Sequence, residues 1–296
     1  MNRIEVAHKA MKRIYDQGGA PLDQICELTC LAIDKLAGIS TEQYRGISGK
    51  DYFVYVLGSF RSRPIRSSLM LSDTTSFRDS WTEFLASIDG QTRSSTMDTV
   101  KIDSVLYTAI MGFASCFDIW KPKSRKTPGT HFEVLLGSVL TKFLPDLARS
   151  KFIPLPNQDE KLSTDIVFGN ERGGIVIPAK ITTRERIVQP YAHQRILDSI
   201  FPEGRYRSIL MCVSETQRDD DETAVNEICV PGTVRLFQTH LSSLSGIYYL
   251  DPPARYMQED VAALVRVGSY GTLLRNDLAG LALFTTLAPL VAPPAP

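Results

Sequence analysis

The chain has 296 residues, and its 33 Lys and Arg side chains are matched by 33 Asp and Glu side chains, so the formal net charge is zero. This length allows one large domain or two small ones, and 43% apolar with 22% charged residues is typical of a folded globular protein. The balanced charge excludes a protein that is basic throughout, although a specific nucleic-acid binder needs only a local basic surface.

The first 120 residues have apolar positions mostly at helical spacing, for example Ile4, Ala7, Met11 and Ile14. This pattern predicts a mainly helical N-terminal region over residues 1–120. Basic residues interrupt the apolar ones near the N-terminus, so we expect an amphipathic helix there and not a signal peptide. Residues 61–79 are rich in Ser, Arg and Thr and are expected to form a loop.

The five cysteines show neither the spacing of a disulfide framework nor that of a zinc site, so we expect packed thiols in a reducing cytoplasm. Residues 278–291 are apolar but contain Thr285, Thr286 and Pro289, and this run is too short and broken to span a membrane. A cytoplasmic protein without a membrane partner is therefore expected. The cysteines are Cys26, Cys30, Cys116, Cys212 and Cys229.

A basic segment, residues 121–126 with the sequence KPKSRK, follows the helical region. It is either a surface that contacts phosphates, through Lys123, Arg125 and Lys126, or a solvated linker between domains. We place the domain boundary here, between residues 1–120 and 121–296. A helix is expected next, from His131 to about Leu144.

Residues 165–180 predict a β-hairpin that ends in an acid and a lysine. Asp165 precedes a short apolar run, the turn signals Gly169-Asn170 and Gly173-Gly174 follow, and a second apolar run leads to Lys180. Pairing of the two arms brings Asp165 and Lys180 to one end of the hairpin. A carboxylate can hold a hard cation such as Mg²⁺, and a lysine can orient or activate water beside a phosphate. This combination predicts phosphodiester hydrolysis.

The triplet Arg184-Glu185-Arg186 follows within a few residues. It is either a solvated charged turn or a group that reads bases, since arginine bonds bidentately to guanine and glutamate accepts from the cytosine amino group. Two copies related by a two-fold axis would then read CC on one strand and GG on the other, at a palindromic site.

The rest of the chain alternates strands and helices. Pro190 suits a first helical position, so a helix is expected over 190–200. Further expectations are a buried strand at 208–213, a polar loop at 215–221, a strand at 228–230, a helix at 233–244 and a strand at 246–250. This order predicts an α/β fold, a mixed β-sheet flanked by helices, with a helical N-terminal part.

The region from Asp165 to Gln194 resembles the PD-(D/E)XK nucleases. The run from Lys180 through Arg186 to Gln189 is similar to the branch of type II restriction endonucleases that cut CCGG, CCNGG or CCWGG sites. Residues 129–136, GTHFEVLL, are similar to the helix that supplies a further glutamate in that branch, here Glu133. The resemblance implies a restriction-endonuclease-like core, Mg²⁺ held by Asp165 and Glu133, catalysis by Lys180, and base recognition by Arg184, Glu185 and Arg186.

The chain departs from the family pattern at its second carboxylate. Pro178 stands where the acid of the acid-x-Lys motif belongs, and the positions to which the branch moves this acid hold His193 and Gln194. Two replacements stay open: Glu133 as the second negative ligand, or His193 as a nitrogen ligand or proton carrier. An acid in the first turn of a helix is also expected simply to oppose the helix dipole.

The expected function is a Mg²⁺-dependent, site-specific endonuclease for double-stranded DNA, acting as a homodimer or as a tetramer of paired dimers. Lys123, Arg125, Lys126 and Gln189 are the expected contacts to the DNA backbone, and the loop at 61–79 is a further candidate. The alternatives are a DNA-binding protein that has lost cleavage, and a repair or junction-resolving nuclease with the same core. The sequence has no phosphate-cradling glycine loop and no nucleophile elbow, so it does not favour a small-molecule enzyme.

Overall fold

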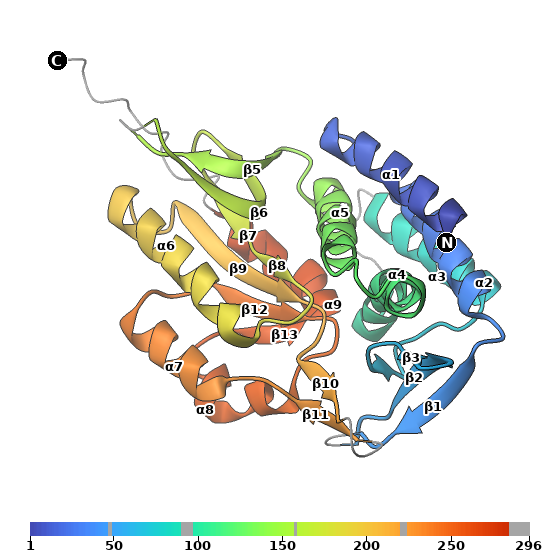
Figure 1. Cartoon of the computed structure of the whole chain (residues 1–296). Helices are drawn as coiled ribbons and strands as arrows, with labels where there is room; N and C mark the ends of the chain where they lie inside the picture. The colour runs from blue at the N-terminus through green and yellow to red at the C-terminus, as the bar shows by residue number, and fades with distance from the viewer. Residues whose placement is uncertain (47–48, 90–96, 157–158, 220–223, 284–296) are drawn as a thin grey trace.

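The computed structural model describes residues 1–46, 49–89, 97–156, 159–219 and 224–283, apart from the side chains of residues 89, 184 and 185. Its centre is a seven-stranded mixed sheet with the order β13-β12-β9-β7-β6-β5, in which β8 also pairs with β9 (Figure 1). The strands β7, β8, β9, β12 and β13 pair in parallel, whereas β5 and β6 are antiparallel to their neighbours. The strands are β5 (Ala148–Pro154), β6 (Lys161–Asn170), β7 (Gly173–Ile177), β8 (Ala179–Lys180), β9 (Tyr206–Cys212), β12 (Gly246–Tyr249) and β13 (Val267–Ser269).

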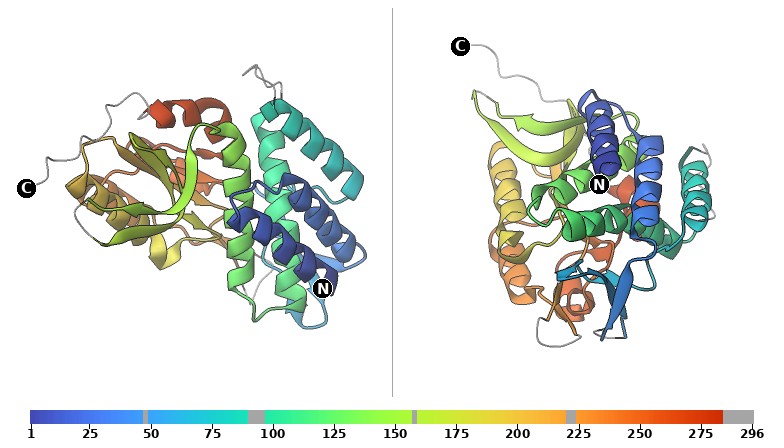
Figure 2. Two further views of the ribbon diagram at one scale, coloured as in Figure 1. Left: turned by 90° about the horizontal axis from the view of Figure 1, so that it is seen from above. Right: turned by 45° about the vertical axis from the view of Figure 1, so that its right-hand side comes forward.

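Side chains alternate between the two faces of this sheet, as the period of a strand requires. Ile209 and Met211 point into a core shared with the N-terminal helices, while Leu210 and Cys212 point into a second core shared with the helices of the C-terminal half. Helices thus cover both faces, as Figures 1 and 2 show. The second face is covered by α6 (Val188–Ile200), α7 (Pro231–His240) and α8 (Glu259–Ala262). The predicted fold class is therefore confirmed.

The N-terminal region contains the predicted helices and also an antiparallel four-stranded sheet that the sequence reasoning missed. Its central strand is an alternating aromatic and β-branched run, YFVYVL, which is a clear strand signal. The predicted loop at 61–79 is wrong, because this segment includes β4 and the start of α3. The elements are α1 (Asn2–Asp16), α2 (Leu22–Leu36), β1 (Ser40–Tyr44), β2 (Tyr52–Leu57), β3 (Phe60–Arg61), β4 (Ile65–Arg66), α3 (Thr74–Asp89) and α4 (Thr99–Trp120).

Two helices connect the N-terminal region to the central sheet. The helix α4 is the one helix of the described chain that is long and apolar enough to cross a membrane, but 94% of that stretch is buried within the protein, as in a core helix. The next helix, α5 (Lys126–Phe143), begins five residues before the expected start at His131. Pro128 does not prevent this, because the N–H groups of the first helical turn have no partner within the helix. The boundary at residue 120 stays a prediction, and one apolar cluster includes residues from both sides of it.

The C-terminal half differs from the sequence expectations at two places. The expected loop at 215–221 contains a strand, β10 (Thr216–Arg218), and the expected strand at 228–230 lies three residues too late, because β10 pairs with β11 (Val225–Glu227). Beyond β11 the Val230 N–H donates to the Tyr256 hydroxyl at 2.9 Å, so it leaves the ladder. Residues 220 and 221 lie outside the described residues. The remaining elements are η1 (Arg184–Ile187), η2 (Ala254–Met257), α9 (Tyr270–Thr272), η3 (Leu273–Asp277) and α10 (Leu278–Leu281).

Candidate active site

Asp165 on β6 and Lys180 on β8 form an ion pair, with Lys180 Nζ 2.7 Å from Asp165 Oδ2. The same carboxylate oxygen accepts the backbone N–H of Ala179 at 2.8 Å. The two side chains are 23% and 14% exposed, so water reaches both of them. The hairpin predicted from the sequence therefore brings this acid and this lysine together, while their catalytic roles stay predictions.

Pro178 explains how the backbone opens at this point. Pairing between β6 and β7 ends at Ile166 opposite Ile177, so the next residue, Pro178, needs no N–H for that ladder. Its carbonyl accepts the N–H of Met211 at 3.0 Å, which continues the parallel pairing to β9. On the other side the Asp165 carboxylate takes the place of a ladder acceptor for Ala179. The proline thus marks where β8 separates from β6.

The pairing between β5 and β6 is also irregular beside Asp165. Ser150 lies opposite Val167 and Phe152 lies opposite Ser163, so β6 residues 164–166 face the single residue Lys151. Asp165 is the middle residue of this bulge. Irregular pairing of this kind is common next to active sites, where it redirects a side chain.

Glu133 approaches the same site from α5. Lys151 Nζ lies 3.3 Å from Glu133 Oε2, and the glutamate side chain is 21% exposed. Burial raises the pKa of Glu133 above its usual value, the negative charge of Asp165 raises it further, and Lys151 and Lys180 lower it. The carboxylates of Glu133 and Asp165 are therefore close enough for their charges to interact, and the positive charges of Lys151 and Lys180 partly offset their repulsion.

This donor set fits a hard divalent cation. Mg²⁺ is commonly held by one or two carboxylates, with waters and substrate phosphate oxygens completing its shell. The described part of the chain has no group of three His, Cys, Asp or Glu side chains disposed to hold a metal by themselves. Asp165 and Glu133 are the two acids that would hold the ion. A bound cation would offset the electrostatic repulsion between their two carboxylates.

His193 and Gln194, the other candidates for the missing acid, lie on α6. Burial lowers the pKa of His193, Lys180 lowers it further and Asp165 raises it, so the imidazole is close enough to sense both groups. Its Nδ1 is buried without a hydrogen-bond partner. Gln194, in contrast, ties α6 to β9, since it accepts the Ser208 N–H at 2.8 Å and donates to the Tyr206 carbonyl at 3.1 Å.

The predicted base-reading triplet forms the short helix η1 directly after β8 and before α6. Arg186 is exposed, and its N–H donates to the Thr183 carbonyl at 2.9 Å. The side chains of Arg184 and Glu185 lie outside the described residues. The helix α6 starts at Val188, so the expected start at Pro190 is two residues late. The expected backbone contacts, Lys123, Arg125, Lys126 and Gln189, are all exposed.

Sequence reasoning missed Glu215, which it assigned to a solvated loop. Glu215 is only 1% exposed, and its carboxylate accepts the Thr183 N–H at 3.0 and 3.1 Å, the Thr183 hydroxyl, and the Tyr249 hydroxyl at 3.1 Å. The available signal was its place at the carboxyl end of a buried strand of a parallel sheet, where binding and catalytic groups gather.

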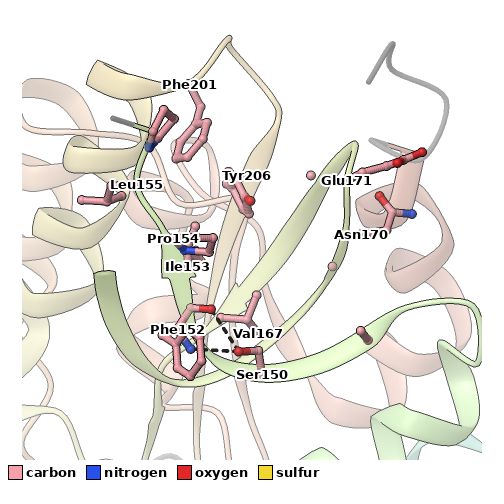
Figure 3. Close-up of a pocket in the computed structure, with 14 residues that line it drawn as sticks. Ser150, Phe152, Ile153, Pro154, Leu155, Val167, Asn170, Glu171, Phe201 and Tyr206 are labelled. Carbon is pink, nitrogen blue, oxygen red and sulfur yellow. Dashed lines mark hydrogen bonds between the residues drawn. The ribbon is translucent and has the colours of Figure 1, made fainter. Parts of the chain in front are cut away.

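The surface of the described residues includes the following two grooves. One, of about 500 Å³, runs along β5 and is lined by Phe152, Pro154, Phe201 and Tyr206, and it extends to the turn at Asn170 (Figure 3). It contains none of the predicted site residues. The other, of about 440 Å³, includes Ile187 and Val188, which directly follow the triplet.

Comparison with known proteins identifies the family. No protein-family model matches the chain, and no curated protein matches it. Among solved structures, it is similar to the crystal structure of the type IIP restriction endonuclease Kpn2I, with 37% sequence identity and a TM-score of 0.86, over 97% of this chain and 100% of that chain. A complex of the restriction endonuclease PspGI with substrate DNA is 11% identical with a TM-score of 0.41, over 69% of this chain and 91% of that chain. On its likeness to Kpn2I over nearly its whole length, the chain belongs to the type II restriction endonucleases.

Proposed function

We propose that this protein is a Mg²⁺-dependent endonuclease that hydrolyses phosphodiester bonds of double-stranded DNA at a short palindromic site containing CC/GG pairs. The observation that carries the proposal is the ion pair between Lys180 and Asp165 where β8 separates from β6. Glu133 lies close enough to this pair that the charges of both residues shift the pKa of Glu133. Membership of the type II restriction endonucleases supports the same reaction.

The proposed roles follow from charge and position. Asp165 and Glu133 would hold Mg²⁺, which supplies a Lewis acid for the phosphate and lowers the pKa of bound water. Lys180 would orient the attacking water and offset the negative charge that grows on the phosphate. The imidazole of His193, whose pKa is lowered, is neutral at neutral pH and is therefore able to accept a proton within the site.

Sequence readout is assigned to Arg184, Glu185 and Arg186. One arginine-glutamate-arginine set can bind two adjacent C·G pairs in the major groove, and a second copy of the chain repeats this on the other half of the site. We therefore propose a homodimer, with a tetramer of paired dimers as the larger assembly. The exposed residues of the basic segment and Gln189 would contact phosphates and set the register on the duplex.

The test is cleavage of plasmid DNA of known sequence with Mg²⁺ or Mn²⁺, followed by mapping of the ends. We expect discrete fragments from the wild type and none from Asp165→Asn or Lys180→Ala. The matched control is Lys161→Ala, which removes an exposed lysine from the same strand as Asp165 and should still cut. Fragments of unchanged yield from Lys180→Ala would remove this lysine from the catalytic site.

A second candidate function is a DNA-binding protein that does not cleave. Pro178 favours it, because this residue provides no ligand where the family pattern has an acid. Specific binding of the wild type to one duplex, with no cutting in either metal, would select it. Cutting that is independent of sequence, or restricted to branched DNA, would instead select a repair or junction-resolving nuclease.

A further inference from the structure

The segment between the proposed catalytic lysine and the proposed reading triplet is only three residues long, and hydrogen bonds hold its first and last residues. The Lys180 carbonyl accepts the Val213 N–H at 3.1 Å, and the Ile181 carbonyl accepts the Ser214 N–H at 3.2 Å. These bonds continue the pairing of β8 with β9 past the ends of both strands. At the next residues the backbone pairing stops, and a side chain replaces it.

That side chain is Glu215. Both of its carboxylate oxygens accept the Thr183 N–H, and one of them also accepts the Thr183 hydroxyl. Thr183 and Glu215 are each 1% exposed, so these bonds lie away from water, where hydrogen bonds to a carboxylate are strong and costly to lose. The Tyr249 hydroxyl donates to the same carboxylate at 3.1 Å, which attaches it to β12.

Thr183 is also the residue directly before η1, at its N-cap position. Its carbonyl accepts the N–H of Arg186 at 2.9 Å, so the residue that Glu215 holds in turn supports the last residue of the triplet. The Thr183 side chain makes no capping bond within η1, because its hydroxyl is directed to Glu215. One buried carboxylate thus fixes where the triplet starts relative to β9 and β12.

We propose that Glu215 is a positioning residue for sequence recognition. It sets the distance and direction from Lys180 and Asp165 to the triplet, and so couples readout of the bases to the placement of the scissile phosphate. This inference rests on the proposed function, in which the triplet reads C·G pairs. A displacement of about 1 Å in a site of this kind can lower a rate by roughly a hundredfold.

The test uses the mapped recognition site in an oligonucleotide duplex, and a second duplex in which one C·G pair is changed. The measured quantity is the ratio of the two cleavage rates, because a loss of fold stability alone lowers both rates together. We expect the ratio to fall by about tenfold to a hundredfold in Glu215→Ala and by less in Thr183→Val, which keeps the backbone N–H. Thr183→Ser retains the hydroxyl and should restore most of the ratio.

The control is Asp251→Asn. Asp251 is also 1% exposed, lies two residues beyond β12, and accepts bonds from Tyr52 and Arg66; among the described side chains, its hydrogen bonds do not include Thr183 or Arg186. Its loss should lower the melting temperature and leave the ratio as in the wild type. Thermal unfolding of each variant accompanies the cleavage assay.

The outcomes separate the two proposals. If the wild type cuts no DNA, the proposed function fails. If the wild type discriminates between the two duplexes, and the folded variants Glu215→Ala and Thr183→Val show the same ratio of cleavage rates as the wild type, the proposed function stands and the positioning role of Glu215 is wrong. Should Glu215→Ala not fold, Thr183→Val against Thr183→Ser decides the question alone, and equal ratios in these two variants overturn the inference.

Discussion

Two buried histidines make the stability of this protein sensitive to acid. His131 lies on α5, fully buried, with its ring stacked on Phe113 at a centroid distance of 4.2 Å and 5.7 Å from the ring of His8. Burial, followed by the charge of His8, lowers the pKa of His131 from 6.5 to about 3. Burial, followed by the charge of Lys12, lowers the pKa of His8 to about 4. Glu133 lies only two residues beyond His131 on the same helix.

The sign follows from proton uptake. The unfolded chain protonates these rings near pH 6.5, whereas the folded chain keeps them neutral until much lower pH, so stability falls as the pH falls. For His131 alone, a pKa of about 3 against 6.5 predicts a loss of about 2.5 kcal/mol between pH 7 and pH 4.5. The effects of the two rings are coupled and are not to be added. This loss is a large share of the roughly 5–15 kcal/mol that stabilises a typical domain.

The perturbation is His131→Leu, and the assay is urea unfolding followed by circular dichroism at pH 7.0, 6.0, 5.0 and 4.5. The variant loses packing and one hydrogen bond to the Ala109 carbonyl, so its absolute stability changes. The informative quantity is the difference between pH 7 and pH 4.5, which should shrink by about 2.5 kcal/mol relative to the wild type. The control His240→Leu, at an exposed position on α7, should leave the wild-type difference intact. Parallel curves for wild type and His131→Leu would refute the reasoning.

Three further predictions concern the site and the opposite end of the pH range. Arg186→Ala should raise the activation free energy of cleavage at the mapped site by about 1–3 kcal/mol. Weak, salt-sensitive binding to other DNA should persist, as measured by fluorescence anisotropy at several salt concentrations. An unchanged site preference would exclude Arg186 from the surface that reads the bases. Glu133→Gln should require more Mg²⁺ for half-maximal cleavage. The wild type should lose Mg²⁺ affinity as the pH falls, because the pKa of Glu133 is raised, and this dependence should be weaker in the variant, which keeps only Asp165 as a carboxylate ligand. Equal Mg²⁺ titrations would contradict this. Burial raises the pKa of Asp103 from 3.8 to about 6, so the folded protein disfavours its ionised form and loses stability as the pH rises through 6. The free energy of unfolding of Asp103→Asn, measured with urea at pH 8, should exceed that of the wild type by about 1–3 kcal/mol. No increase at pH 8 would show that ionisation of Asp103 does not destabilise the fold.

The sequence by itself determined the local elements around the site. Two short apolar runs, separated by the turn signals Gly169-Asn170 and Gly173-Gly174, define the hairpin of β6 and β7. The few residues from there to Lys180 place that lysine at the end of the hairpin beside Asp165. Strand and helix signals of this kind depend on near neighbours in the chain, so they can be found without the fold. β2 carries the same kind of local strand signal, the run YFVYVL, although the surrounding sequence has helical spacing.

Tertiary structure alone decided which distant groups meet these local elements. Glu133 comes near Asp165 because α5 packs against the sheet. The same packing raises the pKa of Glu133, first through burial and then through the charge of Asp165. Glu215 is polar in a polar stretch, yet the ends of β9 and β12 bury it against Thr183. Pro178 is acceptable in the sheet only because pairing with β6 ends one residue earlier. For Glu133 and Glu215 the deciding contact joins residues far apart in the chain, and a periodicity of two or 3.6 residues carries no information about it.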